Sequence, residues 1–194
     1  MNADIRKTCD ELAGEGFIAV APDLFWRQEP GVDLGVTSKR DWQHGLRPYQ
    51  AYDRDAGVGD IKDSLDAVAR LPECTGKIGI QGYCFGALMT FLTAVRCRVD
   101  AAVAYHGADT EKYPGEVDNL RAPLLMHLGE EDEFISKAAQ ARIKAALADK
   151  PNAIVYSYPG QRHAFARHKG AHYDPAAAAL ANGRTAEFLH RHLA

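Results

Sequence analysis

The 194-residue sequence has little that favours a membrane, a nucleic acid or a secreted setting. No apolar run approaches the roughly 20 residues of a membrane span, and the first residues lack the apolar core of a signal peptide. A net charge of −3 provides no basic surface for nucleic acid or an anionic membrane. We therefore expect a cytoplasmic protein without nucleic-acid or membrane partners.

Cysteine is scarce, and the four residues present form no recognisable pattern. Cys9, Cys74, Cys84 and Cys97 contain neither a Cys-x-x-Cys pair nor a Cys/His metal spacing. This usage is typical of a reduced compartment, where a free reactive thiol survives. The chain also lacks internal repeats and low-complexity segments, so we expect a single domain covering residues 1–194.

Apolar periodicity predicts alternating helices and strands, hence a mostly parallel sheet with helices on both faces. Residues 23–55 break any period but are rich in aromatic side chains, which favours a flap over a pocket; a loop packed on the core is the alternative. Helices are expected at 3–13, 57–71, 87–95, 136–149 and from 174 to near the end, and strands at 17–21, 78–80, 99–105, 123–128 and 153–158.

The rest of the chain is organised around residues 77–86, a short apolar strand that runs through Gly-x-Cys-x-Gly into a helix. Such a turn strains its central residue, Cys84, and exposes its side chain. A side chain at Gly82 or Gly86 is expected to force strand and helix apart. The helix N-terminus favours a thiolate at Cys84, and the N–H of Phe85 is expected to bind a developing oxyanion.

Three chemically suitable residues follow strand ends in the order nucleophile, acid, histidine. Cys84, Asp132 and His163 each come directly after a predicted strand. Because ligands of parallel sheets bind at the carboxyl ends of the strands, these residues should share one rim. The order is that of an α/β-hydrolase, so the sequence predicts a Cys–His–Asp catalytic triad without a metal or organic cofactor.

Other residues compete for these roles. His106 also lies on the rim and could be a second polar group in the pocket, whereas His127 lies inside a strand and is expected to be a hydrogen-bonded core residue. Glu130, Glu131 and Glu133 could orient the histidine in place of Asp132. A surface position is the default expectation for His44, His168, His172, His190 and His192.

Four segments together resemble the dienelactone hydrolase (carboxymethylenebutenolidase) family: residues 22–24, 56–60, 82–86 and 163–167. The resemblance runs along nearly the whole chain. It implies an α/β-hydrolase fold and hydrolysis of a small carboxylate-bearing enol-lactone to a keto acid such as maleylacetate, in the breakdown of catechols and chlorocatechols. It also implies that Cys84 is the nucleophile, that His163 is the base with Asp132 as its partner, and that Arg167 holds the substrate carboxylate.

The chain departs from the family pattern in two places. A second carboxylate-binding arginine of the family corresponds here to Trp42; Arg40 and Arg47 are close by, and Arg40 is the candidate substitute. Family members also carry a preceding segment with a central strand, a second oxyanion N–H and a glutamate. We therefore expect a chain that is N-terminally truncated relative to the family and lacks its first strands.

The expected activity is cysteine-dependent hydrolysis through a thioester acyl-enzyme. A general thiol esterase acting on other small acids remains an alternative, as does a non-catalytic or redox-responsive relative that only binds a small acid. The expected partner is a small carboxylate-bearing lactone or ester, and the expected state is a monomer or weak homo-oligomer.

Overall fold

The computed structural model describes residues 1–35, 38–168 and 170–194. They form two compact units, Met1–Gly76 and Lys77–Ala194. The expectation of a single domain stays a prediction.

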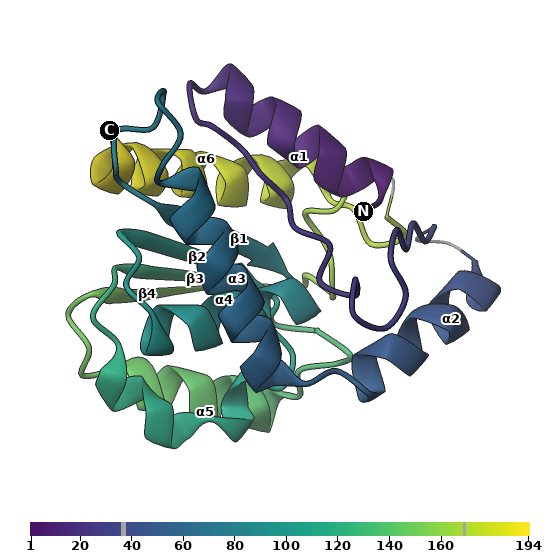
Figure 1. Ribbon diagram of the computed structural model, residues 1–194. Coiled ribbons are helices and arrows are strands. Elements are labelled where there is room, and N and C mark those ends of the chain that lie inside the picture. Colours follow the sequence, from purple (N-terminus) through teal and green to yellow (C-terminus); the bar gives the residue numbers. More distant parts are fainter. Residues whose placement is uncertain (36–37, 169) are drawn as a thin grey trace. The chain divides into compact units, whose positions relative to one another are not determined.

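The described residues of the N-terminal unit form helices (Figure 1), and each helix begins after a polar side chain. They are α1 (Ala3–Gly14), α2 (Lys39–Gln50) and α3 (Arg54–Val68). The side chains of Asn2, Ser38 and Asp53 accept hydrogen bonds from backbone N–H groups of the first turns. Such N-caps satisfy donors that the helix leaves without an intrahelical partner.

Two sequence expectations for this unit are wrong. Residues 17–21 are extended but form no strand, and Ile18 and Val20 are 42% and 56% exposed, because no described segment pairs with them. The irregular stretch 23–55 contains α2, which begins after the Ser38 cap and holds Pro48 in its last turn. Val36 and Thr37 lie outside the described residues.

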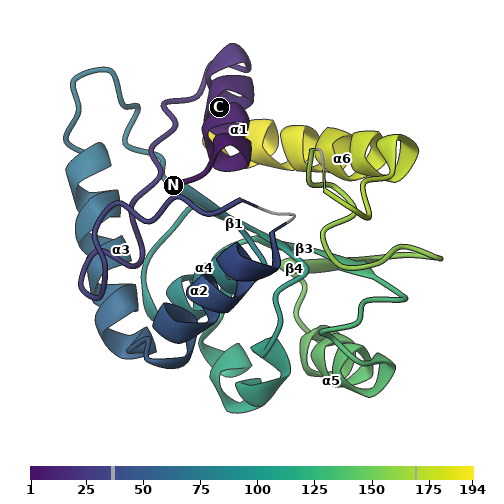
Figure 2. The same cartoon turned by 90° about the vertical axis from the view of Figure 1, so that its right-hand side faces the viewer.

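The C-terminal unit is a parallel sheet in the order β1-β2-β3-β4, which confirms the α/β prediction. Helices α4 and α5 cover one face and α6 the other (Figures 1 and 2). The elements are β1 (Gly79–Tyr83), α4 (Phe85–Arg96), β2 (Ala101–Tyr105), η1 (Thr110–Lys112), η2 (Pro114–Asn119), β3 (Leu124–Gly129), α5 (Lys137–Leu147), β4 (Ala153–Tyr158) and α6 (Pro175–Leu193).

The central strands are buried, and their parallel register brings their carboxyl ends to one edge of the sheet. Strands β2 and β3 are fully buried, and every residue of α4 from Ala87 to Val95 is buried, as expected for a helix that is apolar all round. In register, Tyr83 lies beside Tyr105, and Tyr105 beside His127. The carboxyl ends of the strands therefore meet at a common rim.

A buried polar chain lies on the α6 side of this sheet. His127 Nδ1 contacts the Tyr158 hydroxyl at 2.7 Å, and its Nε2 contacts Thr185 Oγ1 at 3.0 Å. The Thr185 hydroxyl in turn lies 2.6 Å from that of Tyr105. Burial, followed by the charge of Arg184, lowers the pKa of His127 to about 3, so the imidazole is neutral. The prediction of a satisfied core histidine is confirmed.

Candidate active site

Cys84 occupies the sharp turn between β1 and α4. Its backbone has φ 53° and ψ −116°, a conformation that is uncommon for a residue with a side chain. The N–H of Cys84 donates to the Tyr105 carbonyl at 3.0 Å, and its own carbonyl accepts from the N–H groups of Ala87 and Leu88. The surrounding hydrogen bonds thus hold the strained turn in place, as the sequence predicts.

The two glycines of the turn are not equivalent. A Cβ atom on Gly82 would lie 2.1 Å from the carbonyl oxygen of Gly86 and 2.6 Å from Thr90 Oγ1, so strand and helix approach too closely for any side chain there. A Cβ atom on Gly86 would meet nothing within 4 Å. The steric expectation is confirmed for Gly82 and wrong for Gly86, because only Gly82 faces the helix backbone.

Asp132 and His163 form a buried pair on the same rim. His163 Nδ1 lies 2.8 Å from Asp132 Oδ2, and the two side chains are 7% and 0% exposed. The second carboxylate oxygen, Oδ1, accepts the N–H groups of Phe134 at 2.8 Å and Ile135 at 3.1 Å. The carboxylate is therefore fixed by its own loop. Among the carboxylates considered from the sequence, Asp132 is the one that contacts the imidazole.

The loops after β3 and β4 are joined to each other, which keeps this pair together. The N–H of Glu131 donates to the Gln161 carbonyl at 2.9 Å. A Cβ atom on Gly129 would lie 2.6 Å from the same carbonyl oxygen, so glycine is needed for this close approach. Buried Gln140 of α5 adds side-chain hydrogen bonds to the carbonyls of Gly129 and Ile135.

His163 is held in its charged form. Burial by itself lowers its pKa, but the Asp132 carboxylate and the adjacent Cys84 thiol outweigh burial and raise the pKa to about 9. Its Nε2 atom is buried, and no described residue gives it a hydrogen bond of normal geometry. Nε2 is the ring nitrogen of His163 that does not contact Asp132.

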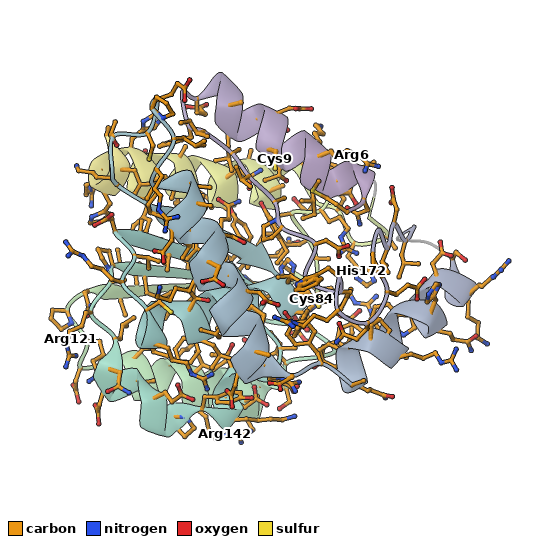
Figure 3. All side chains as sticks on the ribbon, viewed as in Figure 1. Arg6, Cys9, Cys84, Arg121, Arg142 and His172 are labelled. Atoms are coloured by element: carbon orange, nitrogen blue, oxygen red, sulfur yellow. The ribbon has the colours of Figure 1, made fainter. Side chains whose placement is uncertain are left out.

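Glu133 and His172 contact the backbone of His163, an arrangement that the sequence did not predict: Glu133 was considered there only as an alternative to Asp132. Glu133 Oε2 accepts the backbone N–H of His163 at 3.2 Å, and His172 Nδ1 donates to the His163 carbonyl at 3.1 Å. Figure 3 marks His172, whose side chain is 27% exposed. The surface default is therefore wrong for His172. Its position nine residues after His163 carries no periodic signal that could have identified it.

His106 and Arg167 are two further polar residues near His163. The His106 ring lies edge-on to the His163 ring, with centroids 4.6 Å apart. Arg167 is partly buried, and no described carboxylate forms an ion pair with its guanidinium. Arg40, by contrast, is exposed on α2 in the other unit, and its role in substrate binding stays a prediction.

The parallel sheet, the strained strand–Cys–helix turn, and the acid and histidine after later strands define an α/β-hydrolase. The sequence profile of the dienelactone hydrolase family matches residues 1–193. The chain belongs to the dienelactone hydrolase family, a family of hydrolases that act on lactones or esters.

Several known proteins are similar over most of their length. A relative from Azospirillum brasilense is 38% identical over 193 residues, spanning 100% of this chain and 83% of the relative. The carboxymethylenebutenolidase of Pseudomonas putida is 36% identical, with 97% and 80% covered. The solved structure of a dienelactone hydrolase-like promiscuous phosphotriesterase from metagenomic libraries has a TM-score of 0.77 at 21% identity, with 97% and 80% covered; it shows the fold alone.

No helix among the described residues combines the length and the apolar character needed to cross a membrane.

Proposed function

We propose that Cys84, His163 and Asp132 are the catalytic triad of a lactone or ester hydrolase that works through a thioester. The observation that carries this proposal is the buried 2.8 Å contact between His163 and Asp132 beside the strained Cys84 turn. A nucleophile, a base within reach of it and a group that orients the base are the parts that covalent catalysis requires. The raised pKa of His163 favours an imidazolium, which can donate a proton to a leaving group.

In the first half-reaction the Cys84 thiolate attacks the substrate carbonyl carbon, and the carbonyl oxygen becomes an oxyanion near the N–H of Phe85, the first residue of α4. The C–O bond then breaks, and the leaving oxygen takes a proton from the His163 imidazolium. In the second half-reaction neutral His163 takes a proton from water, whose oxygen attacks the thioester. Cleavage of the C–S bond restores the thiolate and the imidazolium.

The substrate class we propose is a small carboxylate-bearing enol-lactone of the dienelactone type, which would be hydrolysed to a keto acid such as maleylacetate during catechol or chlorocatechol breakdown. Several relatives are named carboxymethylenebutenolidase. Arg167 supports this proposal because its guanidinium, on the rim and without an ion pair to any described carboxylate, suits a bidentate contact with a substrate carboxylate. A general thiol esterase is the competing candidate.

The triad is tested by replacing the nucleophile and by labelling. We expect Cys84→Ala to abolish release of acid from activated esters while the melting temperature is unchanged. The matched control, Cys97→Ala at the opposite end of α4, should retain activity. Iodoacetamide should label Cys84 before Cys9, Cys74 and Cys97 in a mass-spectrometric time course. Substantial turnover by the Cys84→Ala protein would contradict the proposal.

The carboxylate preference is tested with two para-nitrophenyl esters of equal acyl length, the half-ester of adipic acid and the ester of hexanoic acid. Arg167→Ala should raise KM for the half-ester about tenfold or more, because a charge-assisted hydrogen bond is lost, and leave the neutral ester nearly unchanged. Arg142→Ala, on the exposed side of α5, is the control. Equal losses on both esters would favour a general esterase in which Arg167 is structural.

A further inference from the structure

His106 is a buried polar residue that the triad does not use. His106 is 1% exposed, yet neither of its ring nitrogens has a hydrogen-bond partner among the described residues. Leaving such a group unpaired destabilises the folded state, so each buried polar group without a partner requires an explanation. His127, one strand further on, shows the usual arrangement, with both of its nitrogens bonded.

The backbone of His106 is also strained. Its φ of 43° lies in the left-handed region, which costs free energy for a residue with a side chain. The N–H of His106 donates to the His127 carbonyl at 2.8 Å, so the turn is fixed to the sheet. Cys84, at the end of the neighbouring strand, is strained in the same sense. Strained backbone conformations of this kind cluster at functional sites, where the surrounding structure holds them in place.

The surroundings of His106 define the chemistry of its partner. Its ring contacts the His163 ring edge-on at 4.6 Å. Burial, and after it the positive charges of His163 and Arg167 and the proximity of His127, hold the pKa of His106 well below its ordinary value. His106 is therefore a neutral imidazole, with one N–H donor, in contact with the His163 ring and affected by the positive charge of Arg167. A cation would be repelled there, whereas an anionic acceptor is favoured.

We propose that His106 binds the substrate by donating a hydrogen bond to the carboxylate that Arg167 pairs with. This inference rests on the proposed function and specifies its carboxylate site. One guanidinium charge balances one carboxylate charge, and the uncharged imidazole adds a directional donor without excess positive charge. His106 is then a determinant of specificity for acid-bearing substrates, and not a second base.

The same two para-nitrophenyl esters test the inference. We expect His106→Phe to raise KM for the adipate half-ester about tenfold with kcat within about threefold of wild type, because a hydrogen bond to a charged group is lost. KM for the hexanoate ester should change less than twofold. His106→Asn should recover much of the loss, since asparagine carries a donor and tolerates positive φ. His190→Phe, on the exposed side of α6, is the matched control.

Binding to an inactive protein provides a readout that is independent of turnover. In the Cys84→Ala background, adipate affinity measured by calorimetry should fall with His106→Phe and with Arg167→Ala, and the double variant should lose less than the sum of the two. If His106→Phe does not fold, His106→Gly removes the imidazole and relieves the backbone strain, and the same selective loss is expected.

The outcomes separate the inference from the proposed function. Selective loss of the half-ester by Arg167→Ala but not by His106→Phe or His106→Gly overturns the role of His106 and leaves the proposed function intact. Equal losses on both esters by the His106 variants also overturn it, since they indicate support of His163 or of the attacking water. A wild-type protein that hydrolyses both esters equally and does not bind adipate overturns the carboxylate site itself.

Discussion

Replacement of Asp132 by asparagine tests how the acid acts on His163. Asp132 Oδ1 accepts two backbone N–H groups, from Phe134 and Ile135, and an asparagine oxygen can preserve both contacts. The new amide group would then direct its N–H toward His163 Nδ1, which lies 2.8 Å from the oxygen that it replaces. The imidazole would have to accept at Nδ1 and carry its proton on Nε2, the wrong tautomer for a base that faces Cys84.

The size of the effect follows from the pKa of His163. Asp132 and Cys84 raise that pKa from 6.5 to about 9 against the opposing effect of burial. At 1.36 kcal/mol per pKa unit, the difference corresponds to about 3 kcal/mol of preference for the imidazolium, or roughly a hundredfold. A misplaced tautomer in a related triad arrangement costs up to roughly 10⁴-fold. We therefore expect Asp132→Asn to lower kcat/KM by a factor between about 10² and 10⁴.

Thermal unfolding and cysteine labelling, each followed as a function of pH, measure how Asp132 affects the protonation of His163. The raised pKa of His163 stabilises the fold most below pH 6.5, and this contribution is lost as the pH rises through 9. The wild-type melting temperature should therefore fall over that range more steeply than that of Asp132→Asn. Iodoacetamide labelling of Cys84 should proceed readily at pH 7 in the wild type and should depend more strongly on pH in the variant, because the imidazolium partner is lost.

Glu131→Gln is the matched control for this experiment. It makes the same chemical change one residue away, at a side chain that is 51% exposed and paired with Lys137. We expect its activity to remain within about twofold of wild type. If Asp132→Asn keeps more than a third of the activity, or if its labelling profile matches that of the wild type, orientation by Asp132 is not how this site works.

Local sequence patterns predicted the parts of the fold that local physics decides. Strand 153–158 and the helix caps at Ser136 and Asp174 lie where they were expected, because apolar alternation and capping side chains act within a few residues. The segment 17–21 has the same apolar character but forms no strand. A strand needs a hydrogen-bonded neighbour, and the composition of a segment does not specify which neighbour it has.

In the candidate site, too, the sequence predicted what local patterns decide and missed what depends on contacts between distant segments. Cys84, Asp132 and His163 could be placed on one rim because each follows a strand of a parallel sheet, and the carboxyl ends of such strands meet. The contacts of Glu133 and His172 with the backbone of His163 could not be predicted, since they depend on how two loops fold against each other. The glycine pattern predicted close packing at the turn, but it did not distinguish the glycine that faces α4 from the one that does not.

The remaining predictions concern the groups that hold the site. Glu133→Gln should lower kcat about three- to tenfold with little change in melting temperature, because an uncharged acceptor fixes the His163 backbone and His172 less firmly; an unchanged kcat would show that these contacts are passive. Gly82→Ala and Gly86→Ala should have opposite effects on stability. An alanine at 82 meets backbone at 2.1 Å, so we expect a loss of about 1–3 kcal/mol, which lowers the melting temperature by about 2–12 °C, or failure to fold. An alanine at 86 has open space in the first turn of α4 and gains up to about 1 kcal/mol in helix propensity, so its melting temperature should hold or rise. Calorimetric scans of the two variants test the asymmetry, and equal destabilisation would mean that strand and helix do not pack as described.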